Sequence, residues 1–348
     1  MYLSPEMTTE YEFGLNMAFF NNRISFDASY YNRNSDKQIM SLNMDPSTGY
    51  TYRNMNLGKI RNQGVELLFN VTPIETRDFS WDVTLNFTKN WSKVISLPEE
   101  LGGVASIYGF SGGTGMYAMT GYPVGVFKAQ VAERDPQGRI VVSAANGLPQ
   151  PASDYAIIGD MNNRYQMGVS TRFSYKGVSL SADFDIRKGG IMFSRTKDIN
   201  YFTGNAIQTT YNDRNNFIVP NSVNKVTDDA GNVTYVENTT PISTANYYAY
   251  WGNGGTDLGS FSLVDKSYVK LRSLVLSWDL PRKWLVKTPL QGVQVSAYGN
   301  NLFLWTPSSN TFIDPETTSF GNDLAGNFGE YTANPSSRVF GFNLKVKF

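Results

Sequence analysis

The sequence contains 348 residues, and its 30 Lys and Arg residues balance 30 Asp and Glu residues, so it lacks the basic character of nucleic-acid-binding proteins. It has no Cys and no His, which excludes disulfides, thiolate nucleophiles, His-dependent catalytic triads and metal sites built from these residues. No run of eighteen apolar residues occurs, so the sequence predicts no membrane-spanning helix.

Two β-hairpins are predicted near the N-terminus, where apolar and polar residues alternate. Successive side chains of a strand point to opposite faces, so each segment should have one apolar and one polar face. Asn tolerates a positive φ angle, which suits Asn21-Asn22 to a tight turn between the first two strands. The four strands cover residues 11–19, 24–30, 65–71 and 79–87.

The clearest hairpin covers residues 164–175 and 178–187, which Lys176-Gly177 joins. One face of both strands is apolar, and the other is polar and partly charged. A soluble sheet seldom needs strands this long with ionised groups on its inner side, whereas a barrel with lipid outside and water inside does. The charged residues could line a substrate path, although pairing across strands for hydration and register is the simpler interpretation. These candidates are Arg164, Arg172, Asp183, Asp185 and Arg187.

Three further strands complete a predicted set of nine. They cover residues 274–280, 293–297 and 340–348. The alternation breaks just before the first of them, because Lys270 and Arg272 share the parity of Leu274. A β-bulge, or emergence of the strand from the membrane, would explain this break.

The links between strands differ consistently in length. Those after the first, third, fifth and seventh strands are short, and the others are long. Bacterial outer-membrane barrels have short periplasmic turns and long extracellular loops. We therefore predict an all-β fold, an antiparallel transmembrane barrel with long loops outside the cell and Phe348 at the periplasmic rim. The long links cover residues 36–59, 93–163, 188–266 and 305–337.

Several motifs, in their order along the chain, resemble one receptor family. The N-terminal Leu3-Ser4-Pro5-Glu6 and the segment 11–15 are similar to a strand entry of TonB-dependent receptors. Further segments resemble the SusC/RagA branch of Bacteroidetes, and together the matches cover nearly the whole chain. They are residues 60–67, 79–87, 121–127, 185–190, 267–274, 299–303 and 339–348.

The resemblance implies a 22-stranded barrel plugged by an N-terminal domain, with import of glycans or peptides driven through TonB. It also implies a SusD-like surface lipoprotein that covers the barrel. Residues 1–12 lack the basic start and apolar core of a signal peptide. We therefore expect residues 1–348 to be the C-terminal portion of a receptor, about nine strands, without plug domain or signal peptide.

Aromatic residues of the long links are candidates for stacking on sugar rings or for contact with the SusD-like partner. Packing of the loops upon themselves is an equally good interpretation, because long ordered loops need a core of their own. The four candidates are Tyr247, Tyr250, Trp251 and Trp305.

The expected function is to form the wall and loops of a TonB-dependent nutrient importer in the outer membrane of a Gram-negative cell, in contact with lipid. A passive porin-like or structural barrel is the alternative. An outer-membrane hydrolase is a less favoured alternative, because such enzymes usually rely on His and this sequence has none. A soluble carbohydrate-binding sandwich would have shorter strands and more similar loops at its two ends. We expect no catalytic residue, metal ion or cofactor, and no nucleic-acid partner.

Overall fold

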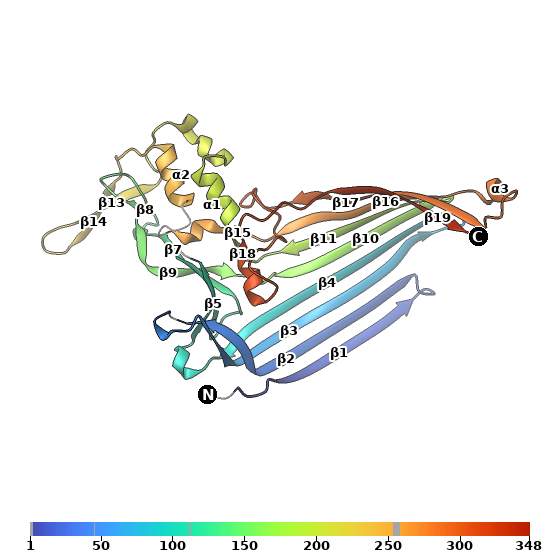
Figure 1. Cartoon of the computed structure of the whole chain (residues 1–348), viewed down its shortest axis with the longest axis horizontal. Coiled ribbons are helices and arrows are strands. Elements are labelled where there is room, and N and C mark those ends of the chain that lie inside the picture. The colour runs from blue at the N-terminus through green and yellow to red at the C-terminus, as the bar shows by residue number, and fades with distance from the viewer. Residues whose placement is uncertain (1–2, 45, 111–112, 253–257) are drawn as a thin grey trace.

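A computed structural model describes residues 3–44, 46–110, 113–252 and 258–348. Its main element is one antiparallel nine-stranded sheet, whose strands follow each other in chain order (Figure 1). This confirms the nine predicted strands. They are β1 (Met7–Phe19), β2 (Ile24–Asn43), β3 (Tyr52–Glu75), β4 (Phe79–Ser96), β10 (Tyr165–Tyr175), β11 (Val178–Lys188), β16 (Tyr268–Asp279), β17 (Gly292–Trp305) and β19 (Val339–Lys347).

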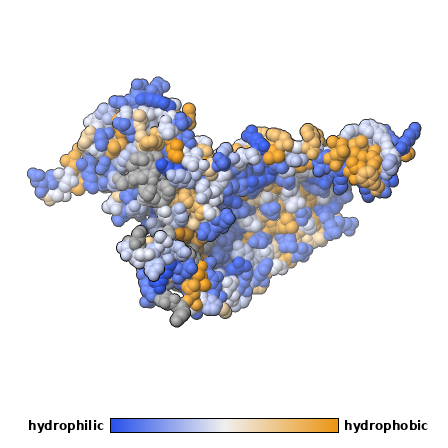
Figure 2. Space-filling view, viewed as in Figure 1, coloured by the Kyte–Doolittle hydropathy of each residue, from blue (hydrophilic) through white to orange (hydrophobic). Residues whose placement is uncertain are grey.

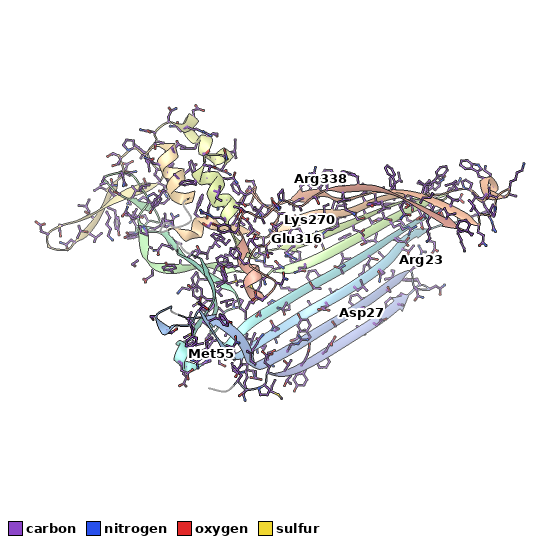
Figure 3. All side chains as sticks on the ribbon, in the orientation of Figure 1. Arg23, Asp27, Met55, Lys270, Glu316 and Arg338 are labelled. Atoms are coloured by element: carbon purple, nitrogen blue, oxygen red, sulfur yellow. The ribbon has the colours of Figure 1, made fainter. Side chains whose placement is uncertain are left out.

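The two ends of this sheet differ as predicted. Short links, one of which contains α3 (Arg282–Leu285), lie at the end near Arg23, whereas the long links gather at the end near Met55 (Figures 1 and 3). The β10–β11 turn has positive φ angles of 47° at Lys176 and 86° at Gly177, as a two-residue turn of type I′ requires. No helix in the described ranges is long and apolar enough to cross a membrane.

The first long link is shorter than predicted. Residues 36–59 were expected to form a loop, but β2 and β3 stay paired from Asp36 opposite Lys59 to Asn43 opposite Tyr52. Only 44–51 connects them, with the 3₁₀ turn η1 (Pro46–Thr48). The backbone ladder therefore continues beyond the membrane-facing part of the strands, and Met55 of this extension is buried in a hydrophobic core with residues of the loops.

The predicted irregularity at residues 268–273 is a β-bulge at Arg272. Asp183 of β11 pairs with Ser273, and the next residue, Phe184, pairs with Leu271, so Arg272 has no partner in the ladder. The register with β17 shifts at the same place. An extra residue in one strand shifts the alternation, so that residues before and after the bulge differ in parity but share a face. Lys270 and Ser273 therefore both lie on the polar, concave face of the sheet, which we call the inner face.

The apolar face of the sheet has no second protein layer. None of Leu85, Tyr165, Phe184 and Phe342 belongs to a hydrophobic core within the described residues, and the Phe342 side chain is 85% exposed. Hydrophobic residues gather on the surface around β19 and α3, while polar residues dominate the hollowed side of the sheet (Figure 2). The sheet is therefore a single curved layer, and the structure supports a partial transmembrane β-barrel.

The other long links fold into a compact loop assembly at one end of the sheet (Figure 1). We use this name for residues 97–164, 189–267 and 306–338. Its described residues form three small sheets and two α-helices. Its strands are β5 (Val104–Phe110), β6 (Thr114–Met119), β7 (Val126–Ala132), β8 (Ile140–Val142), β9 (Pro151–Asp160), β12 (Ile191–Ser194), β13 (Ser222–Thr227), β14 (Val233–Glu237), β15 (Leu263–Asp265) and β18 (Gly329–Glu330); its helices are α1 (Arg195–Phe202) and α2 (Thr244–Gly252).

The loop assembly is built around two hydrophobic cores, the larger of which also includes Met55 and Ile60 of β3 and Val94 of β4. Phe328 is fully buried, and its ring lies 5.5 Å from that of Phe127 and 5.2 Å from that of Phe193, measured between centroids. These residues come from three different links. A second cluster contains Val142, Val219 and Ile242. The interpretation that the long loops pack upon themselves is therefore confirmed.

Candidate functional site

The concave face of the sheet is a polar wall built by strand alternation. One row of paired residues crosses six strands at the level where the loop assembly begins. Because directly paired residues share a face, all six side chains of the row lie on the inner side. The row consists of Ser29, Glu66, Thr88, Gln166, Arg187 and Tyr268.

Two hollows lie along this row and share Tyr31, Glu66 and Asn90 in their lining. One has a volume of about 370 Å³ and extends toward Arg187 and Lys266. The other has a volume of about 450 Å³ and extends toward Glu10 of β1. Carboxylates, amides, hydroxyls and four cationic residues therefore line one continuous polar surface, which can bind a polar solute by hydrogen bonds and charge.

The five charged candidates do not converge on one point. Arg172 is six ladder positions from the row, about 20 Å along the sheet, and its guanidinium donates to Ser179 Oγ at 3.5 Å. Asp183 lies between them, opposite Ser170. Arg164 is exposed just before β10. They are spread along the wall.

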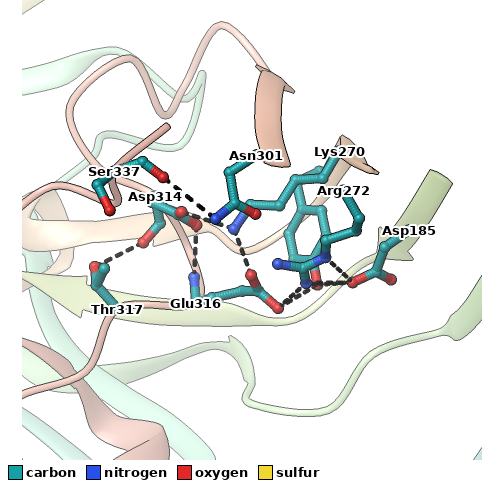
Figure 4. A network of polar contacts seen from close by, with 9 residues as sticks. Asp185, Lys270, Arg272, Asn301, Asp314, Glu316, Thr317 and Ser337 are labelled. Atoms are coloured by element: carbon teal, nitrogen blue, oxygen red, sulfur yellow. Dashed lines mark hydrogen bonds and ion pairs between the residues drawn. The ribbon is translucent and has the colours of Figure 1, made fainter. Parts of the chain in front are cut away.

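Asp185 belongs to a charge network that includes the bulge (Figure 4). The guanidinium of Arg272 pairs with both Asp185 and Glu316. Tyr268 Oη lies 3.0 Å from Asp185 Oδ2 and 2.9 Å from Glu316 Oε1. The bulge turns Arg272 to the inner side together with Lys270, so two cations reach the same carboxylate.

The network ties the last long link to the wall. Lys270 Nζ lies 2.7 Å from Asp314 Oδ2, and both side chains are about 95% buried and sit where the sheet meets the loop assembly (Figures 3 and 4). Burial raises the pKa of Glu316, but hydrogen bonds from Arg272, Lys270 and Tyr268 outweigh it and hold the pKa at about 2. Glu316 is therefore ionised at neutral pH. Sequence reasoning missed both acidic partners, which lie more than 40 residues beyond Lys270; only the break in alternation at Lys270 and Arg272 marked the place.

The loop aromatic candidates have structural partners. Tyr247 packs its ring 5.3 Å from that of Phe217, and Tyr250 donates its hydroxyl to the Pro149 carbonyl at 3.1 Å. Trp305 was assigned to a loop, but it ends β17 and stacks 5.5 Å from Phe303. Trp305 shares the face of Phe303, so the alternation of the strand continues to this residue. The side chain of Trp251 lies outside the described residues.

Known proteins that are similar in sequence agree with this architecture. The sequence profile of the TonB dependent receptor-like β-barrel matches residues 2–302. TonB-dependent receptor P3 of Formosa agariphila is 26% identical over 99% of this chain and 34% of its own length. The receptor SusC of Bacteroides thetaiotaomicron is 33% identical over 96 residues, 27% of this chain and 10% of SusC.

The fold is similar to solved structures as well. A structure of the RagAB peptide transporter superposes with a TM-score of 0.67 at 19% identity, covering 99% of this chain and 35% of that one. The 'closed-closed' state of the RagAB peptide importer gives 0.68 at 22% identity, with the same coverage. This chain thus spans about a third of the length of the relatives that it matches. It belongs to the family of TonB-dependent receptor-like β-barrels, outer-membrane transporters and receptors of Gram-negative bacteria, and is of the SusC/RagA type.

Proposed function

We propose that this chain forms wall and extracellular loops of a TonB-dependent nutrient importer in the outer membrane. One observation carries the proposal: the sheet is a single layer whose outer face is apolar and uncovered and whose inner face is polar. Such a sheet suits lipid on one side and a hydrated passage on the other. Membership of a transporter and receptor family supports the same function and gives no support to an enzyme.

We further propose that residues 1–348 are the C-terminal portion of a larger barrel, which also carries a plug. Within the described residues, β1 and β19 each pair on one side only. An unpaired strand edge in lipid costs several kcal/mol for each unsatisfied backbone group. Additional strands of the same receptor would satisfy both edges. The coverage of about a third of each relative fits a barrel of roughly 22 strands.

The proposed cargo is an oligosaccharide or a peptide, and the proposed partners are TonB and a SusD-like lipoprotein. TonB would act through the plug region, and the lipoprotein would meet the loop assembly. The similarity to SusC and to the RagAB peptide transporter supports a partner of this kind. The inner wall offers both sugars and peptides hydroxyl, amide and carboxylate partners along the row that contains Glu66 and Gln166.

Uptake into cells that carry the intact receptor tests this proposal. Labelled oligosaccharide and peptide mixtures would be supplied to cells with and without functional TonB. Energised import predicts that accumulation against a gradient requires TonB, whereas a passive pore would equilibrate cargo in both strains. Uptake that is unchanged without TonB would overturn the proposal. Migration of the unheated receptor on gels, compared with the boiled sample, controls for barrel folding.

A further inference from the structure

A buried lysine lies where three segments of the chain meet above the inner wall. Lys266 is 6% exposed, and its ammonium lies 3.4 Å from the Met161 carbonyl. Its backbone N–H donates to the carbonyl of Gly190 at 2.9 Å. Gly190 has a φ of 81°, and a Cβ there would lie 2.9 Å from the Met161 carbonyl oxygen. The segments are thus held in close contact, and they fix Lys266 beside the end of β11.

Arg187 of β11 lines the same hollow as Lys266. Its guanidinium carbon lies 5.3 Å from the centre of the Tyr268 ring, a cation–π contact that orients the group. The Nε atom of Arg187 is buried and has no hydrogen-bond partner. A buried donor without a partner costs about 1 to 3 kcal/mol, so this guanidinium is oriented but not satisfied.

No carboxylate of the described chain lies within 4 Å of either cation, although ten such pairs occur elsewhere in it. Asp185, the nearest acidic residue along β11 on the same face, pairs with Arg272 instead. Glu66 lines the opposite side of the hollow, three strand spacings from Arg187, about 14 Å. The Arg187 side of the hollow therefore keeps an uncompensated positive charge.

The pKa of Lys266 reflects this environment. Burial lowers it, the charge of Arg187 lowers it further, and the charge of Asp160 raises it, which leaves the pKa at about 8. Lys266 is still mostly protonated at neutral pH. Asp160 itself is engaged locally, because its Oδ1 accepts the backbone N–H of Asn162 at 2.8 Å.

We propose that Arg187 and Lys266 form an oxyanion-binding site on the inner wall, which takes a carboxylate, sulfate or phosphate group of the cargo. Arg offers two parallel N–H donors to such a group, and Lys adds a point charge. The amide oxygen of Asn163, which lines the hollow and is buried without a partner, would accept from a hydroxyl or N–H next to the anion. The proposal rests on the proposed function and narrows its cargo to an anionic class.

Anion titration of the intact receptor in detergent tests this site. Sodium sulfate, sodium phosphate and sodium acetate would be titrated separately by calorimetry at constant ionic strength. We expect Arg187→Gln and Lys266→Met each to weaken binding of the preferred anion about tenfold. Lys345→Gln, on the inner face of β19 and far from the hollow, is the matched control and should bind like the wild type. The ranking of the three anions identifies the chemical group.

Two results would overturn the site: no binding by the wild type up to about 100 mM anion, or equal affinities in all variants. Loss of heat-modifiable migration on gels would reveal that Arg187→Gln or Lys266→Met fails to fold. In that case Arg187→Lys tests the site, since it keeps the positive charge but loses the two parallel N–H donors. It should bind more weakly than the wild type, and unchanged binding counts against the proposal. If the anion titration fails while uptake still requires TonB, only the anion site is rejected. If uptake does not require TonB, the proposed importer function is rejected.

Discussion

The transmembrane sheet and the loop assembly are stabilised in opposite ways. In the sheet, no other part of the protein covers apolar side chains such as that of Phe342, and polar side chains line the concave face. In the loop assembly, aromatic side chains such as Phe127 and Phe328 are fully buried by residues from distant links. Lipid replaces the protein core for the sheet, but the loops stand in water and must make a core from themselves.

This difference means that the two regions should respond differently to the same kind of substitution. Removing an aromatic ring from the loop core leaves a cavity, whereas mobile lipid chains can fill the space left on the outer face. Adding a charge harms the outer face of the sheet and not its inner face. The network of Lys270, Glu316 and Arg272 joins the two regions, so its loss should affect the loops and spare the sheet.

The largest effect is expected for Phe328→Ala in the loop core. Phe328 contacts the rings of Tyr108, Phe127 and Phe193 from the two other links, so truncation should cost about 3 to 5 kcal/mol in the stability of the loop assembly. Hydrogen–deuterium exchange of the intact receptor should show faster exchange over β6, β7 and β12. Phe342→Ala on β19 is the control and should leave these strands protected. Equal exchange in both variants would contradict the contrast between the regions.

A charge placed on one or the other face of β10 tests which face of the sheet meets lipid. Val169 points outward near the middle of the strand, and its neighbour Ser170 points inward, opposite Asp183. Val169→Arg should cost about 2 to 4 kcal/mol near the bilayer centre, measured by urea unfolding in lipid vesicles. Ser170→Arg should be nearly neutral, because its charge meets water and a carboxylate. Similar losses for both variants would show that the outer face does not meet lipid.

The faces of the sheet were predictable because they depend only on neighbours in the chain. A period of two assigns each residue of β10 and β11 to lipid or water without knowledge of anything distant. The bulge at Arg272 was visible for the same reason, as a local break in the period. The extension of β2 and β3 was not, since Met55 is buried there against residues of distant links, which no local period reveals.

The loop cores and the charge network could not be predicted from the sequence. Phe127, Phe193 and Phe328 meet across roughly 200 residues of chain, and no periodic pattern relates them. The acidic partners of Lys270 come from another link in the same way. Arg187 was recognised as a charged wall residue, but Lys266 was not, because its burial depends on the crossing of three segments.

A moderate effect is expected for Glu316→Gln, which tests the connection between the regions. The amide keeps an acceptor for Lys270 and Arg272 but loses its charge, so the link of residues 306–338 should be destabilised by about 1 to 2 kcal/mol. Faster hydrogen exchange confined to this link is the expected result. Glu100→Gln on the exposed turn η2 (Glu99–Leu101) is the control.

The same network predicts a dependence on pH. The pKa of Glu316 is about 2 in the folded state, below its ordinary value near 4.5, so its contribution is present above pH 4.5 and is lost as the pH falls toward 2. Protection of residues 306–338 in the wild type should decrease over this range. Glu316→Gln should lack this component, and a decrease of the same size in the variant would assign the pH dependence to another group.

The smallest effect is expected at the β10–β11 turn, where the sheet depends on backbone conformation rather than on lipid. Gly177 has a φ of 86°, and a Cβ there would lie 3.1 Å from the Asp279 carbonyl oxygen of the neighbouring strand. Gly177→Ala should therefore cost about 1 kcal/mol in urea unfolding from vesicles. Gly14→Ala, at an ordinary φ with its nearest neighbour 4.0 Å away, should cost less. Equal costs would mean that the loss arises from the strands and not from the left-handed turn, and the short turns would then contribute little to the register that separates the two faces.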